Sequence, residues 1–141
     1  MNINENMIAL NQAFSNKNEA IALSGQLLFE HGYIEEEYIE KMIERDESLS
    51  TFMGNFIAIP HGTGGSDHLI KESGISIVQV PNGVYFGENL VTVIFGIAGK
   101  GGEHLDLLSQ IAILCEDIKN VQKIADAQSR AEILSLIEGD F

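Results

Sequence analysis

The chain has 141 residues, a length typical of one domain, and 45% of them are hydrophobic, enough for a core without disulfide or metal support. The chain has 21 acidic and only 8 basic residues, so its net charge is −13, which argues against binding to nucleic acids or anionic membranes. A single cysteine excludes an internal disulfide. The sequence contains neither a secretory signal nor an apolar stretch of about 18 residues, so we expect a cytoplasmic protein without direct membrane insertion.

The first part of the chain predicts one strand followed by two helices. The short apolar run Met7–Leu10 is the predicted strand. Ser15 is the predicted N-cap of a helix that ends near Gly32, since apolar residues recur at helical spacing between them. A second helix is expected over Ile34–Asp46. Its predicted inward face consists of Tyr38, Ile39, Met42 and Ile43.

The middle of the chain predicts buried strands separated by loops. The apolar run Phe56–Ile59, stopped by Pro60, is typical of a strand covered on both faces. A polar loop is expected over Gly62–Ser73. Two further strands, Ile75–Val80 and Leu90–Ile97, are predicted with a short β-type piece, Val84–Phe86, between them.

The last part of the chain predicts a long helix and a helical tail. The long helix is expected over Glu103–Glu116, and one or two short helices over Val121–Ile137. Helices interleaved with buried strands indicate an α/β domain, with no boundary inside the chain. The predicted apolar stripe of the long helix consists of Leu105, Leu108, Ala112 and Cys115, flanked by Leu107, Ile111 and Leu114.

His61 is the most informative candidate for chemistry. It follows a predicted buried strand that ends at Pro60, a residue without an N–H for the sheet ladder. His61 therefore emerges at the carboxyl end of a covered strand, where open α/β sheets place their ligands. Gly62 lets the backbone approach closely or adopt a positive φ. A histidine that only satisfies a strand-end hydrogen bond is the alternative, and the residues alone leave both roles open.

His104 and Arg45 are two further candidates, both of them suited to an anion. His104 lies at the start of the long helix, where unpaired N–H groups and the positive dipole end favour phosphate. Arg45, one of two arginines, offers a planar donor fork. The alternatives are a solvent-facing His104 and an ion pair of Arg45 with its acidic neighbours. The pair Gly99-Lys100 does not complete a nucleotide-binding loop.

The remaining histidines and the cysteine indicate no second site. His31, at a helix end, is predicted to be structural, and His68 is predicted to be solvated. No histidine spacing matches a metal site, so neither a metal nor a cofactor is expected. Cys115 has no basic neighbour in sequence, which predicts a small buried hydrophobe.

Three collinear stretches together resemble a known protein family. The run Gly54–Thr63, which reads GNFIAIPHGT, is similar to the active-site signature of the enzyme IIA domains of the mannitol/fructose class. These domains belong to the bacterial phosphoenolpyruvate-dependent sugar phosphotransferase system. Gly32–Arg45 resembles the helical segment before that signature, and Gly101–Ser109 resembles the later histidine motif. The resemblance covers nearly the whole chain and is strongest to the mannitol-specific type.

The resemblance implies a fold, a reaction and two partners. The fold is a single α/β domain over residues 1–141, with a mixed central β-sheet flanked by helices on both faces. The reaction is that of a phosphotransferase: His61 accepts phosphate from phospho-HPr through Nε2 and passes it to a cysteine on the IIB domain of a membrane mannitol transporter. The expected partners are therefore HPr and that IIB domain.

The resemblance also implies roles for the residues around His61. His104 and Arg45 match family residues that line the phosphorylation site, and Gly62 and Thr63 are expected to contact the phosphate. Because partner binding must be transient, we expect an apolar patch near His61 with a polar rim. Its predicted members are Phe52, Met53 and Phe56.

Three other functions stay open at the level of sequence. A fructose-type IIA shares the Pro-His-Gly core. A regulatory module of the nitrogen-regulatory type would use phosphorylation of His61 to switch its affinity for another protein, with no sugar involved. A histidine-based metalloprotein would bind stoichiometric zinc. Transfer of phosphate to a mannitol-type IIB cysteine distinguishes the leading hypothesis from all three.

Overall fold

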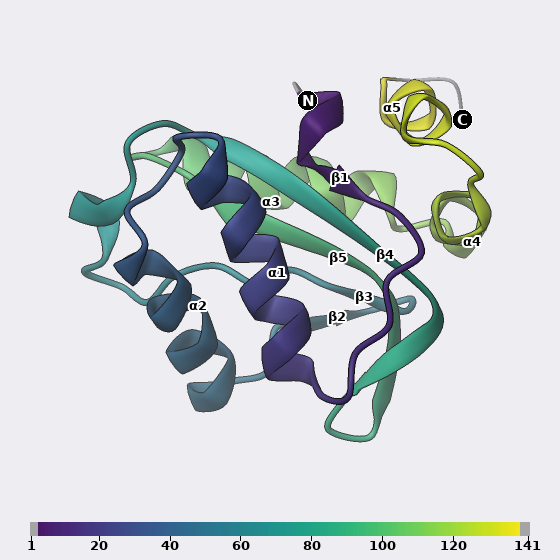
Figure 1. Ribbon diagram of the computed structural model, residues 1–141, viewed down its shortest axis with the longest axis horizontal. Helices are drawn as coiled ribbons and strands as arrows, with labels where there is room; N and C mark the ends of the chain where they lie inside the picture. Colours follow the sequence, from purple (N-terminus) through teal and green to yellow (C-terminus); the bar gives the residue numbers. More distant parts are fainter. Residues whose placement is uncertain (1–2, 139–141) are drawn as a thin grey trace.

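A computed structural model describes residues 3–138, which form one five-stranded sheet with helices on both faces (Figure 1). The strands are β1 (Ile8–Ala9), β2 (Phe52–Gly54), β3 (Ile57–Ala58), β4 (Gly74–Phe86) and β5 (Asn89–Ala98). The helices are α1 (Lys17–Glu30), α2 (Glu37–Ser48), α3 (Glu103–Leu114), α4 (Ile118–Asp126) and α5 (Arg130–Ile137). Among these residues no helix has the length and apolar character needed to cross a membrane.

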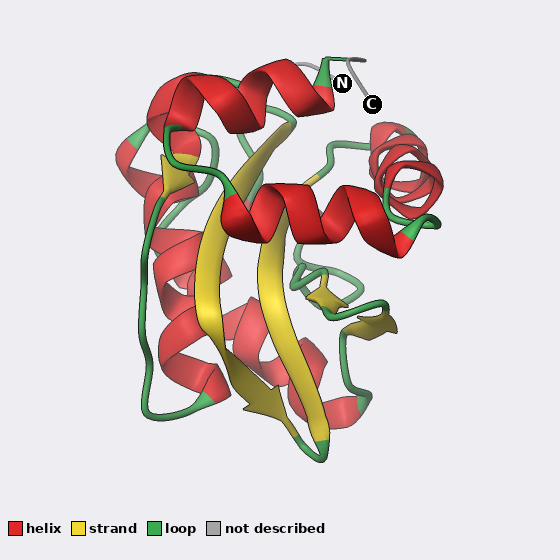
Figure 2. Cartoon of the chain, turned by 90° about the vertical axis from the view of Figure 1, so that its right-hand side faces the viewer, coloured by secondary structure: helices red, strands yellow, loops and turns green. Residues whose placement is uncertain are grey.

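The sheet is mixed, as the family resemblance implied. Its strand order is β1-β4-β5-β3-β2. β1 runs parallel to β4 and β3 runs parallel to β5, whereas the β4–β5 and β2–β3 pairs are antiparallel. Figure 2 shows the two long central strands, β4 and β5, curving side by side. The short strand β3 lies next to β5, so the segment that follows β3 starts beside the centre of the sheet.

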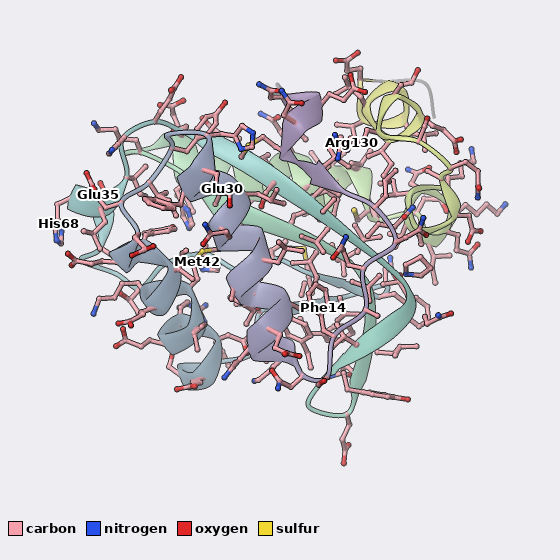
Figure 3. All side chains as sticks on the ribbon, in the orientation of Figure 1. Phe14, Glu30, Glu35, Met42, His68 and Arg130 are labelled. Atoms are coloured by element: carbon pink, nitrogen blue, oxygen red, sulfur yellow. The ribbon has the colours of Figure 1, made fainter. Side chains whose placement is uncertain are left out.

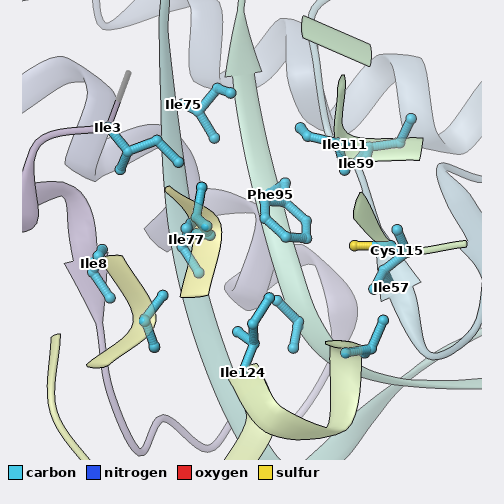
Figure 4. Packing of buried hydrophobic residues seen from close by; sticks show 14 of the residues in the cluster. Ile3, Ile8, Ile57, Ile59, Ile75, Ile77, Phe95, Ile111, Cys115 and Ile124 are labelled. Atoms are coloured by element: carbon cyan, nitrogen blue, oxygen red, sulfur yellow. The ribbon is translucent and has the colours of Figure 1, made fainter. Parts of the chain in front are cut away.

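Alternation of side chains along the strands divides the core into two halves. Ile75 and Ile77 of β4 and Phe95 of β5 pack against α3, α4 and α5 on one face, as the close view in Figure 4 shows. Val78 of β4 and Ile94 of β5 belong to the core against α1 and α2. Both faces of the sheet are therefore covered, which explains the continuous apolar runs in the strand sequences.

The first two helices differ from the sequence prediction at their starts. The N-cap of α1 is Asn16, whose side chain accepts a hydrogen bond from Glu19 N, so the assignment to Ser15 was wrong. α2 begins at Glu37, because Ile34 forms an isolated bridge with Ile70 at the sheet's end. The predicted inward face of α2 is confirmed: Tyr38 and Met42 are buried, and Ile39 and Ile43 pack against the same core.

The strands also differ in extent from the prediction. β3 covers only Ile57–Ala58, because Phe56 adopts a positive φ of 65° and is exposed. β2, which is three residues long, was not predicted from the sequence. The two predicted pieces Ile75–Val80 and Val84–Phe86 are joined in one strand, β4, by a bulge between Gln79 and Val84.

The predicted apolar stripe of α3 was wrong in half of its members. Leu105 is 69% exposed and Ala112 is exposed, whereas Ile111 is fully buried. Leu107, Leu108 and Leu114 pack against the same core as Ile111 and Cys115. α3 is therefore rotated relative to the predicted stripe, and Leu105 faces outward beside His104.

Candidate functional site

The path of β3 explains where His61 lies. Ile57 and Ile59 pack in the core that faces α3, and the two-residue period of a strand places His61 on that same face. His61 pairs with Ile97 of β5 in a parallel bridge just beyond β3. It is 8% exposed, so its ring lies at the edge of the core, where α3 begins.

The hydrogen bonding of His61 determines which ring nitrogen carries the proton. Its Nδ1 lies 2.7 Å from the carbonyl oxygen of Ile59. A carbonyl oxygen only accepts hydrogen bonds, so Nδ1 is the protonated nitrogen and Nε2 of the neutral ring keeps its lone pair. Burial lowers the pKa of His61, and the charges of His104 and Arg45 act in the same direction against the Ile59 hydrogen bond. The ring is therefore neutral near neutral pH, with Nε2 as a nucleophile.

His104 is brought to His61 by the start of α3. The two imidazole rings have centroids 5.0 Å apart and are tilted by 56°. Gly99 permits this approach, because a Cβ at that position would overlap the backbone of His104. Burial lowers the pKa of His104, with Arg45 adding to the effect and Asp67 opposing it. The functional interpretation of His104, as a residue facing the same site as His61, is the one the fold favours.

Arg45 lies near the end of α2 without an acidic partner among residues 3–138. Its Nη1 donates to the carbonyl oxygen of Leu49 at 2.7 Å. Two of its acidic neighbours are paired elsewhere: Glu44 lies 3.1 Å from Lys41, and Asp46 lies 2.7 Å from Lys17. A third, Glu47, forms no ion pair with Arg45. The alternative of a surface ion pair is therefore not what the fold produces, and the remaining guanidinium donors are available to an anion.

These side chains meet in a cavity of about 380 Å³. It is lined by Tyr38, Arg45, His61, Gly62, Thr63, Gly64, Gly65, Ser66, Asp67, Ile70, Gly99, Gly101 and His104. All five site residues expected from the sequence are thus brought together. The first turn of α3 also borders the cavity through His104, and its N-cap, Gly102, makes no side-chain capping hydrogen bond.

The loop after His61 forms one wall of the cavity. Gly62 N–H already donates to Tyr38 Oη at 2.8 Å, so Gly62 contributes its small size rather than a free donor. A Cβ at Gly62 would overlap the Tyr38 ring. Ser66 Oγ donates to the carbonyl oxygen of Thr63 at 2.5 Å, which closes the loop on itself. The hydroxyl of Thr63 borders the cavity.

Among the cavity residues that were not identified from the sequence, three have polar side chains: Tyr38, Ser66 and Asp67. Tyr38 was interpreted only as a core residue of its helix, because a tyrosine at helical spacing gives no sign of where its hydroxyl points. Ser66 and Asp67 lie in a polar loop whose shape the composition does not specify. Asp67 is the acidic residue of the lining. Burial raises the pKa of Tyr38 and Asp67 adds to that effect, whereas burial lowers the pKa of His104 and Asp67 opposes it.

The other predicted features lie away from this cavity. His68 is exposed and points away from the molecule (Figure 3). His31 is exposed, and its Nδ1 lies 2.8 Å from the carbonyl oxygen of Leu27 at the end of α1. Within residues 3–138, no group of three or more His, Cys, Asp or Glu side chains is arranged to hold a metal ion. Burial raises the pKa of Cys115 to about 12, which leaves the thiol protonated and unreactive.

The predicted apolar patch differs in its members. Met53 is 38% exposed, but Phe52 packs into the core. Phe56 is exposed at the start of β3, the opposite end from His61. Leu49 and Leu105, at 67% and 69% exposure, are exposed apolar residues next to two residues of the lining: the carbonyl oxygen of Leu49 accepts from Arg45, and Leu105 follows His104 in the chain.

Known proteins resemble this chain in sequence and in fold. The family model described as "Phosphoenolpyruvate-dependent sugar phosphotransferase system, EIIA 2" matches residues 1–139. The chain is 53% identical over 130 residues to a mannitol-specific phosphotransferase enzyme IIA component of Bacillus subtilis, covering 92% of this chain and 91% of that protein. The crystal structure of IIA mannitol from Escherichia coli matches with a TM-score of 0.91 and 30% identity, covering 97% of this chain and 99% of that one. IIA in an Escherichia coli complex with phosphorylated IIB mannitol matches with a TM-score of 0.91 and 31% identity, covering 99% and 98% of the two chains.

Proposed function

Since this chain belongs to the EIIA 2 family of the phosphoenolpyruvate-dependent sugar phosphotransferase system, we propose that it carries phosphate from phospho-HPr to a mannitol-specific IIB domain on His61. The observation that supports this most directly is the hydrogen bond from His61 Nδ1–H to the carbonyl oxygen of Ile59. It leaves Nε2 as the only ring nitrogen with a free lone pair. In a ring that lines a cavity with an uncommitted arginine, this is the arrangement that a phosphate acceptor needs.

In the first step, the lone pair of Nε2 attacks the phosphorus of the donor. A bond between Nε2 and phosphorus forms while the bond to the HPr residue breaks, and the electron pair of that bond leaves with HPr. Phosphoryl transfer depends mainly on in-line positioning and on neutralising the equatorial oxygens. His61 needs no base, because burial and its neighbours already keep the ring neutral.

Four groups at the cavity suit the charge of the phosphoryl oxygens. Arg45 supplies a cationic donor that no carboxylate among the described residues occupies. His104 supplies a hydrogen bond from its neighbouring ring, 5.0 Å away between centroids. The first turn of α3 adds free N–H groups and the positive end of its dipole, and Thr63 adds a hydroxyl.

In the second step, a thiolate of the IIB domain attacks the same phosphorus, and the bond to Nε2 breaks with its electron pair returning to the ring. Both partners must reach one opening, so we propose that they dock in turn on the apolar residues beside it. Leu49 and Leu105 flank the cavity residues, and the net charge of −13 favours partners with a basic surface. The Escherichia coli complex of IIA with phosphorylated IIB supports the second encounter.

The test is the intact mass after incubation with phosphoenolpyruvate, enzyme I and HPr, followed by addition of a mannitol-type IIB domain. We expect an acid-labile gain of one phosphate in the wild type and in His68→Ala, whose ring is exposed outside the cavity, but none in His61→Ala. The phosphate should then move to the IIB cysteine. Phosphorylation without that movement would favour a fructose-type or regulatory role, and phosphorylation of His61→Ala would refute His61 as the acceptor.

A further inference from the structure

The parallel pairing of β3 with β5 has an irregular last rung. In a parallel ladder, a bridged residue donates to the carbonyl before its partner and accepts from the N–H after it. Ile97, the partner of His61, follows the first half of this rule, because its N–H donates to the carbonyl oxygen of Pro60 at 2.9 Å. The second half would be a hydrogen bond from Gly62 N–H to the carbonyl oxygen of Ile97.

The hydroxyl of Tyr38 lies between these two backbone groups, in the place of that direct hydrogen bond. Gly62 N–H donates to Tyr38 Oη at 2.8 Å, and Tyr38 Oη donates to the carbonyl oxygen of Ile97 at 3.0 Å. A phenol both accepts and donates, so both backbone groups are satisfied although they are separated by an oxygen atom. Tyr38 is 1% exposed and its ring lies against Gly62.

We propose that Tyr38 is a positioning residue that separates the chain after His61 from the sheet and so holds both the acceptor ring and the cavity wall in place. The proposal rests on His61 as the phosphate acceptor. The backbone before His61 is held by Pro60 on Ile97, and the backbone after it is held through Tyr38. Without the hydroxyl, Gly62 either loses its partner or closes directly onto Ile97, and either change moves the loop that lines the cavity.

The hydroxyl is suited to this role at all physiological pH values. Burial, the largest cause, raises the pKa of Tyr38 to about 12, so the oxygen keeps the proton that it donates to Ile97. Both of its partners are backbone groups, those of Ile97 and Gly62, and within residues 3–138 no other side-chain hydrogen bond joins them. Phenylalanine fills the same space without the hydroxyl, which makes Tyr38→Phe the direct test.

The experiment compares wild type, Tyr38→Phe and Ser76→Ala in single-turnover phosphorylation by phospho-HPr. Ser76→Ala is the matched control. This variant also removes a buried hydroxyl that donates to a backbone carbonyl, that of Ser24 at 2.7 Å, but Ser76 lies outside the cavity lining. We expect Tyr38→Phe to lower the maximal rate by about tenfold or more, since small displacements of reacting groups are costly. The half-saturating concentration of phospho-HPr should stay the same, because Tyr38 is not on the surface.

A second readout is independent of the transfer reaction. In proton–nitrogen spectra of the unphosphorylated protein, Tyr38→Phe should shift the Gly62 amide and the ring nitrogens of His61, and Ser76→Ala should shift neither. An unchanged rate and unchanged His61 resonances in folded Tyr38→Phe would overturn the positioning role. If wild type is not phosphorylated at all, the proposed function fails, and the spectra still decide whether Tyr38 positions His61.

Discussion

Replacing Arg45 by glutamine separates a role in transfer from a role in folding. Among the described residues, Arg45 has no carboxylate partner, and its one hydrogen bond is to the carbonyl oxygen of Leu49 at a helix end. Losing that surface bond costs about 0.5–1 kcal/mol. For a chain of 141 residues this lowers Tm by about 2–4 °C. No buried charge is left without a partner, so the variant should stay folded.

The effect of Arg45→Gln on transfer should be much larger than its effect on stability. Removing one preorganised donor from a developing negative charge costs about 10²–10³ in rate. The assay is rapid-quench phosphorylation by phospho-HPr, with Tm measured on the same samples. Arg130→Gln is the control, because it removes the same charge from an exposed position on α5, across the molecule from α2 (Figure 3). Equal rates in the two variants, or unfolding of Arg45→Gln alone, would refute the reasoning.

Three further predictions follow from the same contacts. Because the pKa of His61 is lowered, its phosphorylation rate should fall only as pH drops below the usual histidine pKa of about 6.5. A midpoint at or above that value in a pH–rate profile would contradict a neutral nucleophile. His104→Ala should slow transfer by about tenfold or more. It should also move the midpoint of His61 to higher pH, because His104 helps to lower the pKa of His61. An unmoved midpoint would argue against the contact between the two rings. Lys17→Met leaves the buried carboxylate of Asp46 with Thr51 alone and should cost about 1–3 kcal/mol, since Lys17 is partly exposed. Although burial alone raises the pKa of Asp46, its hydrogen bonds with Lys17 and Thr51 lower it overall. This stabilisation is therefore complete above the unfolded pKa of about 3.9 and is lost as pH falls through the lower folded value, so thermal melts of variant and wild type should converge in acid.

The position of His61 was predictable from local features. Pro60 ends an apolar run, and a residue that follows such a strand must emerge at its carboxyl end. Two properties of the site were not readable from the sequence. The first is that Arg45 has no carboxylate partner among the described residues. This depends in part on Lys17 and Lys41, which pair with Asp46 and Glu44, and Lys17 lies on another helix. The relay through Tyr38 depends on which carbonyl of β5 its hydroxyl meets, a distance of 59 residues along the chain.

The orientation of α3 was not predictable for a different physical reason. Leucine, isoleucine and alanine occur on most sides of this helix, so its periodicity does not select one buried face. Packing against β5 selects it: Ile111 is buried, while Leu105 and Ile113 are 69% and 72% exposed. Sequence periodicity specifies a buried face only where polar residues mark the opposite side, as they do in α2. The exposed leucine beside His104 is therefore information that only the fold supplies.

The charges around the cavity explain how a strongly acidic protein can accept a phosphate without retaining it. With a net charge of −13, most basic side chains are expected to pair with acids, and Lys17, Lys41 and Lys71 do so. Arg45, the basic side chain of the cavity lining, has no such ion pair among the described residues, so its charge is available to the phosphoryl oxygens in the proposed reaction. Asp67, in the same lining, opposes it, and both histidines are neutral at neutral pH because their pKa values are lowered. The cavity therefore offers directional donors with little net positive charge. In the proposed reaction, the phosphate is then held mainly by its bond to His61, which suits its release when a thiolate attacks.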